Sequence, residues 1–131
     1  MPGPLHGYRI VDLTSNVSGP LATMILGDQG ADVIKIEAPE GDSFRRYHPF
    51  RNAGMSGGFL HLNRNKRSVV LDLKKADARA QLDALIKTAD VFVHALRPKT
   101  IAGLGYDYER VRALNPDIIY CGAFGFGADG P

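Results

Sequence analysis

The chain has 131 residues, of which 44% are hydrophobic and 8% aromatic, and its formal net charge is +2. This length allows one domain with a hydrophobic core. The low charge and few aromatics argue against a nucleic-acid-binding protein, which usually presents a broad basic face interleaved with aromatic side chains. No stretch approaches the ~18 apolar residues of a membrane span. The first residues also lack the basic and apolar regions of a signal peptide.

One cysteine, Cys121, follows an apolar run at 118–120. A single cysteine cannot form a disulfide within the chain, and its apolar neighbours predict a buried, unreactive thiol. Together with the missing signal peptide, this favours the cytoplasm or another reducing compartment.

The first third of the chain predicts a strand, a helix and a second strand. The strands are expected at 9–13 and 32–37, where Val and Ile are frequent. Between them, Ser18 can cap a helix, and Gly30 suits the position after its end. The apolar side of that helix is expected to contain Leu21, Ala22, Met24 and Ile25. A unit of this kind is expected to be parallel and right-handed.

The middle of the chain begins with an irregular segment at 38–57, punctuated by glycine and proline. Loops of this length inside a compact domain usually serve a function or move. A short helical piece at 59–62 and a buried strand at 68–73 are expected to follow.

The last half predicts helices alternating with strands. Apolar residues recur at helical spacing over 76–88, and shorter helices are expected at 99–104 and 108–114. Strands are predicted at 90–94 and 117–121, and the glycine-rich 122–131 reads as a loop. This order predicts a single α/β domain: a Rossmann-like, open, mostly parallel sheet with flanking helices.

Several common catalytic and phosphate-binding patterns are absent from the sequence. Neither G-x-G-x-x-G after the first strand nor the P-loop pattern occurs. The four histidines are scattered, so no metal site is expected, and His94 is expected to be a surface or hydrogen-bonded histidine.

The most distinctive feature is a cluster of positive charge between residues 45 and 75. This window contains eight of the sixteen basic residues and only one acid, Asp72. Local positive fields on α/β proteins often bind phosphates. Ligands of open α/β sheets bind beyond the C-terminal ends of strands, where Lys74, Lys75 and Arg97 would surround one pocket. In the alternative interpretation these three residues, with Lys99, are simply the solvated ends of elements.

The sequence resembles the N-terminal portion of the class III CoA-transferases, the CaiB/BaiF family. Matching segments cover almost the whole chain in the family's order: LHGYRIVDLT at 5–14, GP at 19–20, LGD at 26–28, GADVIKIE at 30–37, LNRNKRSV at 62–69, LDLK at 71–74, ADV at 89–91, RP at 97–98, LG at 104–105, LNP at 114–116, GFG at 125–127 and GP at 130–131. Members of the family include formyl-CoA transferases, carnitine CoA-transferases and α-methylacyl-CoA racemases.

The resemblance implies a binding site for coenzyme A or acyl-CoA, used as a substrate. It places the adenine, ribose and phosphates against Ile36, Glu37, Ala38, Leu71, Asp72, Leu73, Lys74, Leu96, Arg97 and Pro98, and the thioester near Val17 and Ser18. Relatives often carry a basic residue at position 38, so Lys75, Arg45 or Arg46 is expected to compensate for Ala38. Val17 replaces a glutamine typical of formyl-CoA transferases, which argues against that activity.

The resemblance also implies that the catalytic residues lie beyond Pro131. The transferases use an aspartate nucleophile and the racemases a His/Asp pair, and nothing in this chain matches either. We therefore expect a CoA-binding fragment without turnover of its own, lacking the family's small domain and C-terminal part. A racemase-like fragment and a non-catalytic, self-associating CoA-binding module are the alternatives. The expected partners are acyl-CoA and either a second copy or the missing C-terminal half.

Overall fold

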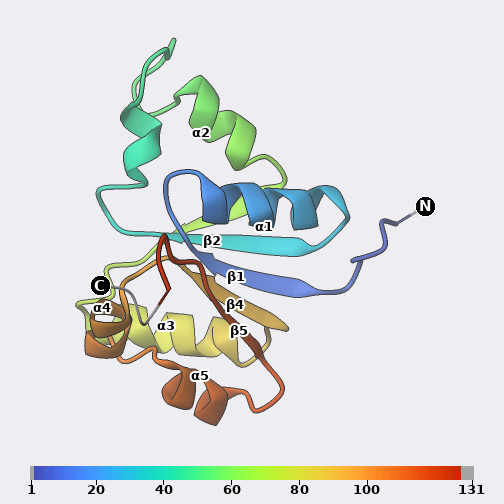
Figure 1. The fold of residues 1–131 in the computed structure, drawn as a ribbon, viewed down its shortest axis with the longest axis vertical. Helices are drawn as coiled ribbons and strands as arrows, with labels where there is room; N and C mark the ends of the chain where they lie inside the picture. Colours follow the sequence, from blue (N-terminus) through green and yellow to red (C-terminus); the bar gives the residue numbers. More distant parts are fainter. Residues whose placement is uncertain (1, 128–131) are drawn as a thin grey trace.

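The computed structural model describes residues 2–127. It contains one five-stranded parallel sheet in the order β3-β2-β1-β4-β5 (Figure 1). The helices α1 and α2 lie on one face, and α3, α4 and α5 on the other. The elements are β1 (Arg9–Leu13), α1 (Ser18–Asp28), β2 (Asp32–Glu37), the 3-10 helix η1 (Ser43–Arg46), α2 (Gly57–Leu62), β3 (Lys66–Val70), α3 (Ala76–Ile86), β4 (Val91–His94), α4 (Pro98–Gly103), α5 (Tyr108–Leu114) and β5 (Ile119–Gly122).

The strand order reverses between β1 and β4. From β1 the chain proceeds outward through β2 to β3, then crosses to the other side of β1, where Leu13 lies opposite His94. Connections that leave in opposite directions open a crevice at the C-terminal ends of the two strands, the usual ligand position in such sheets. The predicted α/β fold with an open parallel sheet is confirmed.

The core is divided between the two faces of the sheet. The larger cluster lies under α3, α4 and α5 and includes Val11, Leu82, Ile86, Phe92 and Val111, all essentially inaccessible to solvent. A smaller cluster under α1 is centred on four buried residues, Ile10, Ala31, Val33 and Val93. The α3 side therefore buries most of the apolar surface.

Helix α1 packs with a different side from the one predicted. Its buried residues are Gly19, Pro20, Thr23, Met24 and Gly27, so of the predicted apolar side only Met24 is buried. Leu21 and Ile25 are 38% and 45% exposed. The reason is close packing: a Cβ added at Gly19 would lie 2.4 Å from the Thr14 Cβ, so only small residues fit against this part of the chain. Ser18 is the first helical residue and not the cap, which is Val17.

The third strand is shorter and less buried than predicted. It runs from Lys66 to Val70 at the edge of the sheet, and Val70 is 61% exposed. Only Leu71, after the strand, is fully buried. An edge strand with few elements packed on it can carry polar residues, which explains why its sequence is so basic.

The other boundaries agree with the predictions to within two residues, and those of β1, β2 and α5 match them, but one burial prediction is wrong. Cys121 is exposed. It lies on the edge strand β5, where Tyr120 packs against the core and the neighbouring side chains point the other way. Among residues 2–127 no helix is long and apolar enough to cross a membrane.

Candidate functional site

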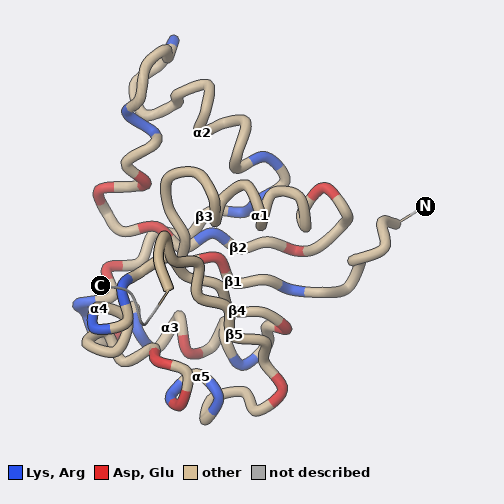
Figure 2. The backbone as a smooth tube through the Cα atoms, in the orientation of Figure 1, with Lys and Arg blue, Asp and Glu red and all other residues tan. Residues whose placement is uncertain are grey.

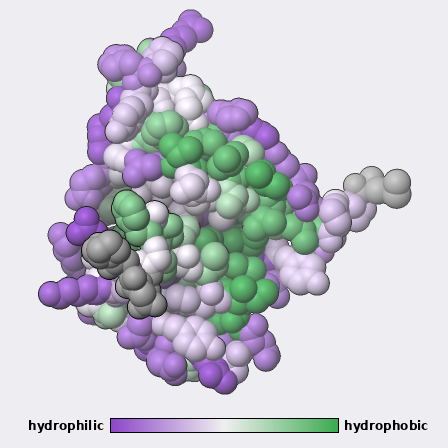
Figure 3. All heavy atoms as spheres, in the orientation of Figure 1, coloured by the Kyte–Doolittle hydropathy of each residue, from purple (hydrophilic) through white to green (hydrophobic). Residues whose placement is uncertain are grey.

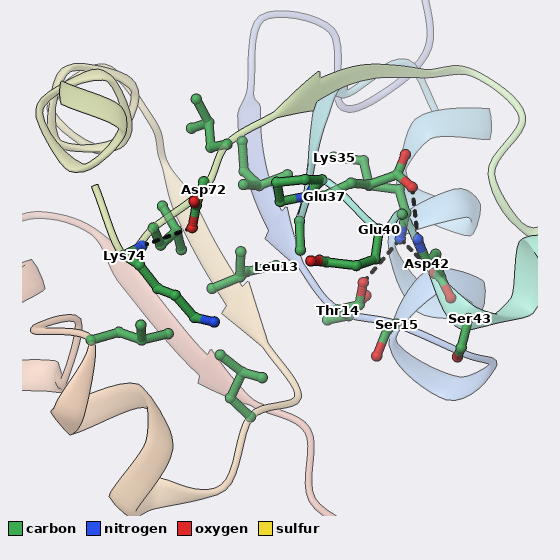
Figure 4. Close-up of a pocket in the computed structure, with 18 residues that line it drawn as sticks. Leu13, Thr14, Ser15, Lys35, Glu37, Glu40, Asp42, Ser43, Asp72 and Lys74 are labelled. Atoms are coloured by element: carbon green, nitrogen blue, oxygen red, sulfur yellow. Dashed lines mark hydrogen bonds and ion pairs between the residues drawn. The ribbon is translucent and has the colours of Figure 1, made fainter. Parts of the chain in front are cut away.

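A pocket of about 450 Å³ opens at the C-terminal edge of the sheet, near the strand-order reversal (Figure 4). Five separate stretches of the chain converge on it. The lining residues are Leu13, Thr14, Ser15, Lys35, Ile36, Glu37, Ala38, Pro39, Glu40, Gly41, Asp42, Ser43, Leu71, Asp72, Leu73, Lys74, Leu96 and Leu104. The pocket is lined by both leucine side chains and charged groups, so it can hold a ligand with an apolar ring and polar substituents.

Eight of the thirteen residues that the sequence singled out line this pocket: Ile36, Glu37, Ala38, Leu71, Asp72, Leu73, Lys74 and Leu96. The other five do not. Val17 and Ser18 are exposed at the start of α1, and Lys75, Arg97 and Pro98 are exposed at the starts of α3 and α4. Arg97 nevertheless directly follows Leu96, so it belongs to the rim of the same crevice.

Sequence reasoning missed several parts of the lining. Pro39 and Glu40 directly follow the second predicted strand, but Gly41 to Ser43 were recognised only as part of an irregular loop, and the Asp42 amide holds this loop against Glu37 at the end of β2. Thr14 and Ser15 were recognisable as residues following a strand. No local signal marked Leu104, the residue after α4, which the fold brings to the pocket.

Glu37 is held by hydrogen bonds from within the protein and is not free to bind a ligand. Arg45 donates to both of its carboxylate oxygens at 2.7 Å, and Ser68 and the Asp42 amide donate at 2.8 and 3.0 Å. Burial alone would raise the pKa of Glu37, but these hydrogen bonds outweigh it and lower the pKa to about 2. Glu37 is therefore an ionised structural part of the pocket wall.

A network of buried charges lies beneath the loop between β1 and α1. Lys66 Nζ lies 3.0 Å from Asp12 Oδ2, and both side chains are at most 2% exposed. Lys35 Nζ donates to the Thr14 carbonyl at 2.9 Å and lies 3.0 Å from Asp42 Oδ2. That last oxygen accepts no hydrogen bond of good geometry among residues 2–127, so the contact is mainly electrostatic.

The same network shapes the loop that leads to α1. Asp42 Oδ1 accepts from the amides of Asn16 and Phe44, which joins the loop to η1. Asn16 has a φ of +65°, in the left-handed region that asparagine tolerates better than most residues. The buried ions therefore fix the position of the loop at the edge of the pocket.

The basic cluster is neutralised more than the sequence suggested. Arg45, Arg64, Lys66 and Arg67 each pair with an acid from another part of the chain: Glu37, Asp28, Asp12 and Asp32, respectively. Figure 2 shows acidic and basic residues interspersed along the backbone. Within residues 2–127 no ion pair forms at Lys74, Lys75, Arg97 or Lys99. The positive charge available to a ligand thus lies at the strand ends and not in the 63–68 segment.

The comparisons with known proteins identify the family. The chain matches the model of CoA-transferase family III over residues 5–131. This protein belongs to that family. It is 42% identical to succinate–glutarate CoA-transferase of Agrobacterium fabrum over 98% of this chain and 34% of that protein. Identity to the probable fatty acyl-CoA transferase Rv3272 of Mycobacterium tuberculosis is 43%, over 98% of this chain and 33% of the relative.

Solved structures agree with this assignment. A CAIB/BAIF family protein from Brucella suis superposes with a TM-score of 0.93 at 37% identity, covering all of this chain and 36% of that one. The structure of Rv3272 gives a TM-score of 0.90 at 43% identity, covering 98% and 36%. The family III chain described here therefore spans about a third of the length of the relatives it matches. The Gly130–Pro131 motif lies outside the described residues.

The environment of His94 contradicts the prediction that it is a surface or hydrogen-bonded histidine. His94 is 1% exposed, and neither ring nitrogen has a hydrogen-bond partner among residues 2–127. Its ring packs against Tyr120 and Phe124, with centroids 5.1 and 5.6 Å away. Burial lowers the pKa of His94, and the nearby Leu96 backbone, whose geometry is too poor for a hydrogen bond, opposes this only in part, so the ring is neutral. No group of three potential metal ligands occurs within the described part of the chain.

Proposed function

We propose that this chain is the acyl-CoA-binding part of a family III acyl-CoA:carboxylate CoA-transferase and that it catalyses no transfer alone. The observation that carries the proposal is the convergence of three separate predicted segments on one pocket beside the strand-order reversal. The relatives named above are transferases, which favours transfer over racemisation. We place the protein in a reducing compartment such as the cytoplasm.

The pocket and its rim suit different parts of CoA. Leu13, Leu96 and Leu104 offer apolar surface to the adenine ring. Lys74 enters the pocket, and Lys75 and Arg97 stand at the start of the adjacent helices, where cationic groups can bind the diphosphate. Val17 and Ser18, beyond the loop after β1, would then lie toward the thioester end. The acyl transfer itself requires a carboxylate nucleophile for which this chain has no matching residue.

Calorimetric titration of the purified chain with CoA tests the proposed site. Lys74→Ala and Arg97→Ala are each expected to weaken binding by about three- to tenfold, because each removes one charge–phosphate contact. Lys87→Ala is the matched control, since Lys87 caps the far end of α3 and does not line the pocket. Unchanged affinity in both site variants would reject the assignment. Acyl transfer by the 131-residue chain alone would reject the claim that it is inactive.

A second function, self-association, is favoured by the outer face of α1. Val17, Leu21 and Ile25 are 47%, 38% and 45% exposed at a spacing of four residues, and no charged residue occurs from 17 to 27. Figure 3 shows the resulting apolar area over α1. Surface helices normally carry charges on their outer side, and apolar patches often mark interfaces. Light scattering is expected to show dimers or larger species that Ile25→Ser reduces. A monomer at high concentration would contradict this function.

A further inference from the structure

The turn between β3 and α3 carries a cation that enters the pocket. Residues 71–74 line the pocket, and Figure 4 shows the Lys74 side chain extending into it. The Lys74 ammonium forms no ion pair with any residue from 2 to 127. Lysine carries a compact charge on a flexible four-carbon stem. The space that this charge can reach is therefore set by the backbone from which the stem starts.

Only part of this turn is held by its own residues. Asp72 Oδ1 accepts a hydrogen bond from the Lys74 amide at 3.2 Å, and the Asp72 carbonyl accepts one from the Lys75 amide at 2.9 Å. The helical hydrogen bonds of α3 begin with the Arg79 amide, which donates to the carbonyl of the capping residue Lys75 at 3.1 Å. The carbonyls of Leu73 and Lys74 lie before this point, so they need a donor from elsewhere.

Arg79 supplies that donor from α3. Its Nη1 donates to the Leu73 carbonyl at 3.0 Å and lies 3.2 Å from the Lys74 carbonyl, and no other hydrogen bond formed by residues 2–127 reaches either oxygen. Arg79 does not line the main pocket. It lines a second cavity of about 310 Å³, and Leu104 belongs to the wall of both. The guanidinium therefore supports the turn from outside the main pocket.

The backbone of Arg79 is anchored in its turn. The Tyr106 hydroxyl lies 2.9 Å from the Arg79 carbonyl, and Tyr106 is buried. Arg79 forms no ion pair among the described residues, and Asp83, one helical turn further along α3, pairs with Arg110. The guanidinium is thus tied to the turn by hydrogen bonds, while its carbonyl is tied to the core through Tyr106.

We infer that Arg79 is a positioning residue for acyl-CoA binding and that it acts through Lys74. The inference rests on the proposed function, in which the Lys74 ammonium binds the diphosphate. Arg79 holds the carbonyls on both sides of the Lys74 amide and Cα, so the turn has fewer conformations to lose when the ligand binds. Arg79 itself contacts no ligand. Its removal is therefore expected to weaken CoA binding only in a chain that still has Lys74.

A double-mutant cycle, measured by calorimetric titration with CoA, tests this role. Arg79→Met keeps the stem of the side chain and removes its donors. It is expected to weaken CoA binding about three- to fivefold, and no more than Lys74→Ala does. In the Lys74→Ala background the same substitution is expected to change the affinity by less than about twofold, because the residue that it positions is gone. This disappearance of the loss would support the inference.

Arg110→Met is the matched control. Arg110 lines the same second cavity and donates to Asp83 at 2.7 Å, without a hydrogen bond to the turn. Its substitution removes one positive charge from this side of the molecule and should leave the CoA affinity within about twofold, because an exposed charge outside the pocket is screened by salt. A loss equal to that of Arg79→Met would show that charge alone matters and would contradict the positioning role.

The possible outcomes separate this inference from the proposed function. If Lys74→Ala weakens binding and Arg79→Met does not, the inference is wrong and the proposed function stands. The same conclusion follows if the two losses multiply in the double variant, because a general loss of stability or of distant charge acts independently of Lys74. If CoA does not bind the wild-type chain, or if Lys74→Ala has no effect, the assigned site and the inference both fail. Urea unfolding reports whether each variant folds. If Arg79→Met does not, Arg79→Gln, which is polar and too short to reach both carbonyls, takes its place in the cycle.

Discussion

Removing the guanidinium of Arg45 is expected to destabilise the protein through Glu37, even though Arg45 lies on an irregular segment. Its Nε and Nη2 each donate to the Glu37 carboxylate at 2.7 Å, and this carboxylate side chain is only 3% exposed. In Arg45→Met the carboxylate keeps its hydrogen bonds from Ser68 and Asp42 but loses its counter-charge. A buried charge without its partner is strongly destabilising.

The size of the effect follows from the pKa of Glu37. Its fall from 4.5 to about 2 corresponds to about 3 kcal/mol of folding free energy at 1.36 kcal/mol per pH unit. Among the contacts that lower this pKa, the hydrogen bonding from Arg45 contributes most, so we expect Arg45→Met to cost about 2–3 kcal/mol at pH 7. Part of this cost comes from the lost contact of the guanidinium with the Phe59 ring, whose centroid is 3.8 Å away.

The pH dependence has a definite sign. Because the folded-state pKa of Glu37 is lowered, its stabilisation is complete above pH 4.5 and is lost as the pH falls toward 2. The difference in the free energy of unfolding between the wild type and Arg45→Met is therefore expected to fall to about half as the pH is lowered from 7 to 3. In Arg45→Met the buried Glu37 carboxyl is easier to protonate. The stability of this variant therefore depends less on pH between pH 7 and pH 3.

Urea unfolding followed by circular dichroism at pH 7 and pH 3 measures both effects. Arg67→Met is the matched control, because Arg67 also contacts both oxygens of a carboxylate, that of Asp32, but is 64% exposed. Exposed pairs of this kind contribute at most about 1 kcal/mol. The reasoning is refuted if Arg45→Met is no more destabilising than Arg67→Met, or if its cost is the same at both pH values.

Two further outcomes test the packing and the sheet edge. Gly19→Ala is expected to lower the free energy of unfolding by about 1–3 kcal/mol, because the new Cβ would lie 2.4 Å from the Thr14 Cβ. The control is Gly103→Ala, which should be neutral or stabilising because no atom lies within 4 Å of its new Cβ. Equal effects of the two substitutions in urea unfolding would contradict this account of α1. The exposed Cys121 thiol should react stoichiometrically with an aromatic disulfide reagent without denaturant, and a reaction that requires unfolding would show that β5 is covered in solution.

The order and type of the elements could be predicted from local pattern. Strands rich in Val and Ile, separated by helices of 3.6-residue periodicity, have few alternatives to an open parallel sheet. The ends of those strands were equally visible, and in a parallel sheet all C-terminal ends lie at one edge. For this reason the segments at 36–38, 71–74 and 96 could be grouped before their neighbours were known, and the structure brings them to one pocket.

Burial and charge compensation were not predictable in the same way. The basic cluster suggested a positive field, but its charges pair with acids 8 to 54 residues away in the chain. Local hydrophobicity placed Leu21 and Ile25 in the core, whereas the close approach of Gly19 to Thr14 turns them outward. Cys121 followed an apolar run and was expected inside, yet β5 lies at the sheet edge.

The difference between these two groups of results has one physical origin. Backbone conformation depends on neighbours within a few residues, because hydrogen-bond periodicity and side-chain sterics act over one or two turns. Whether a side chain is buried, or a charge neutralised, depends on atoms from distant segments, because Coulomb and packing forces act through space. The α/β pattern and the strand-end segments were thus readable along the chain, while the paired Arg45, the outward face of α1 and the exposure of Cys121 are decided only in the folded molecule.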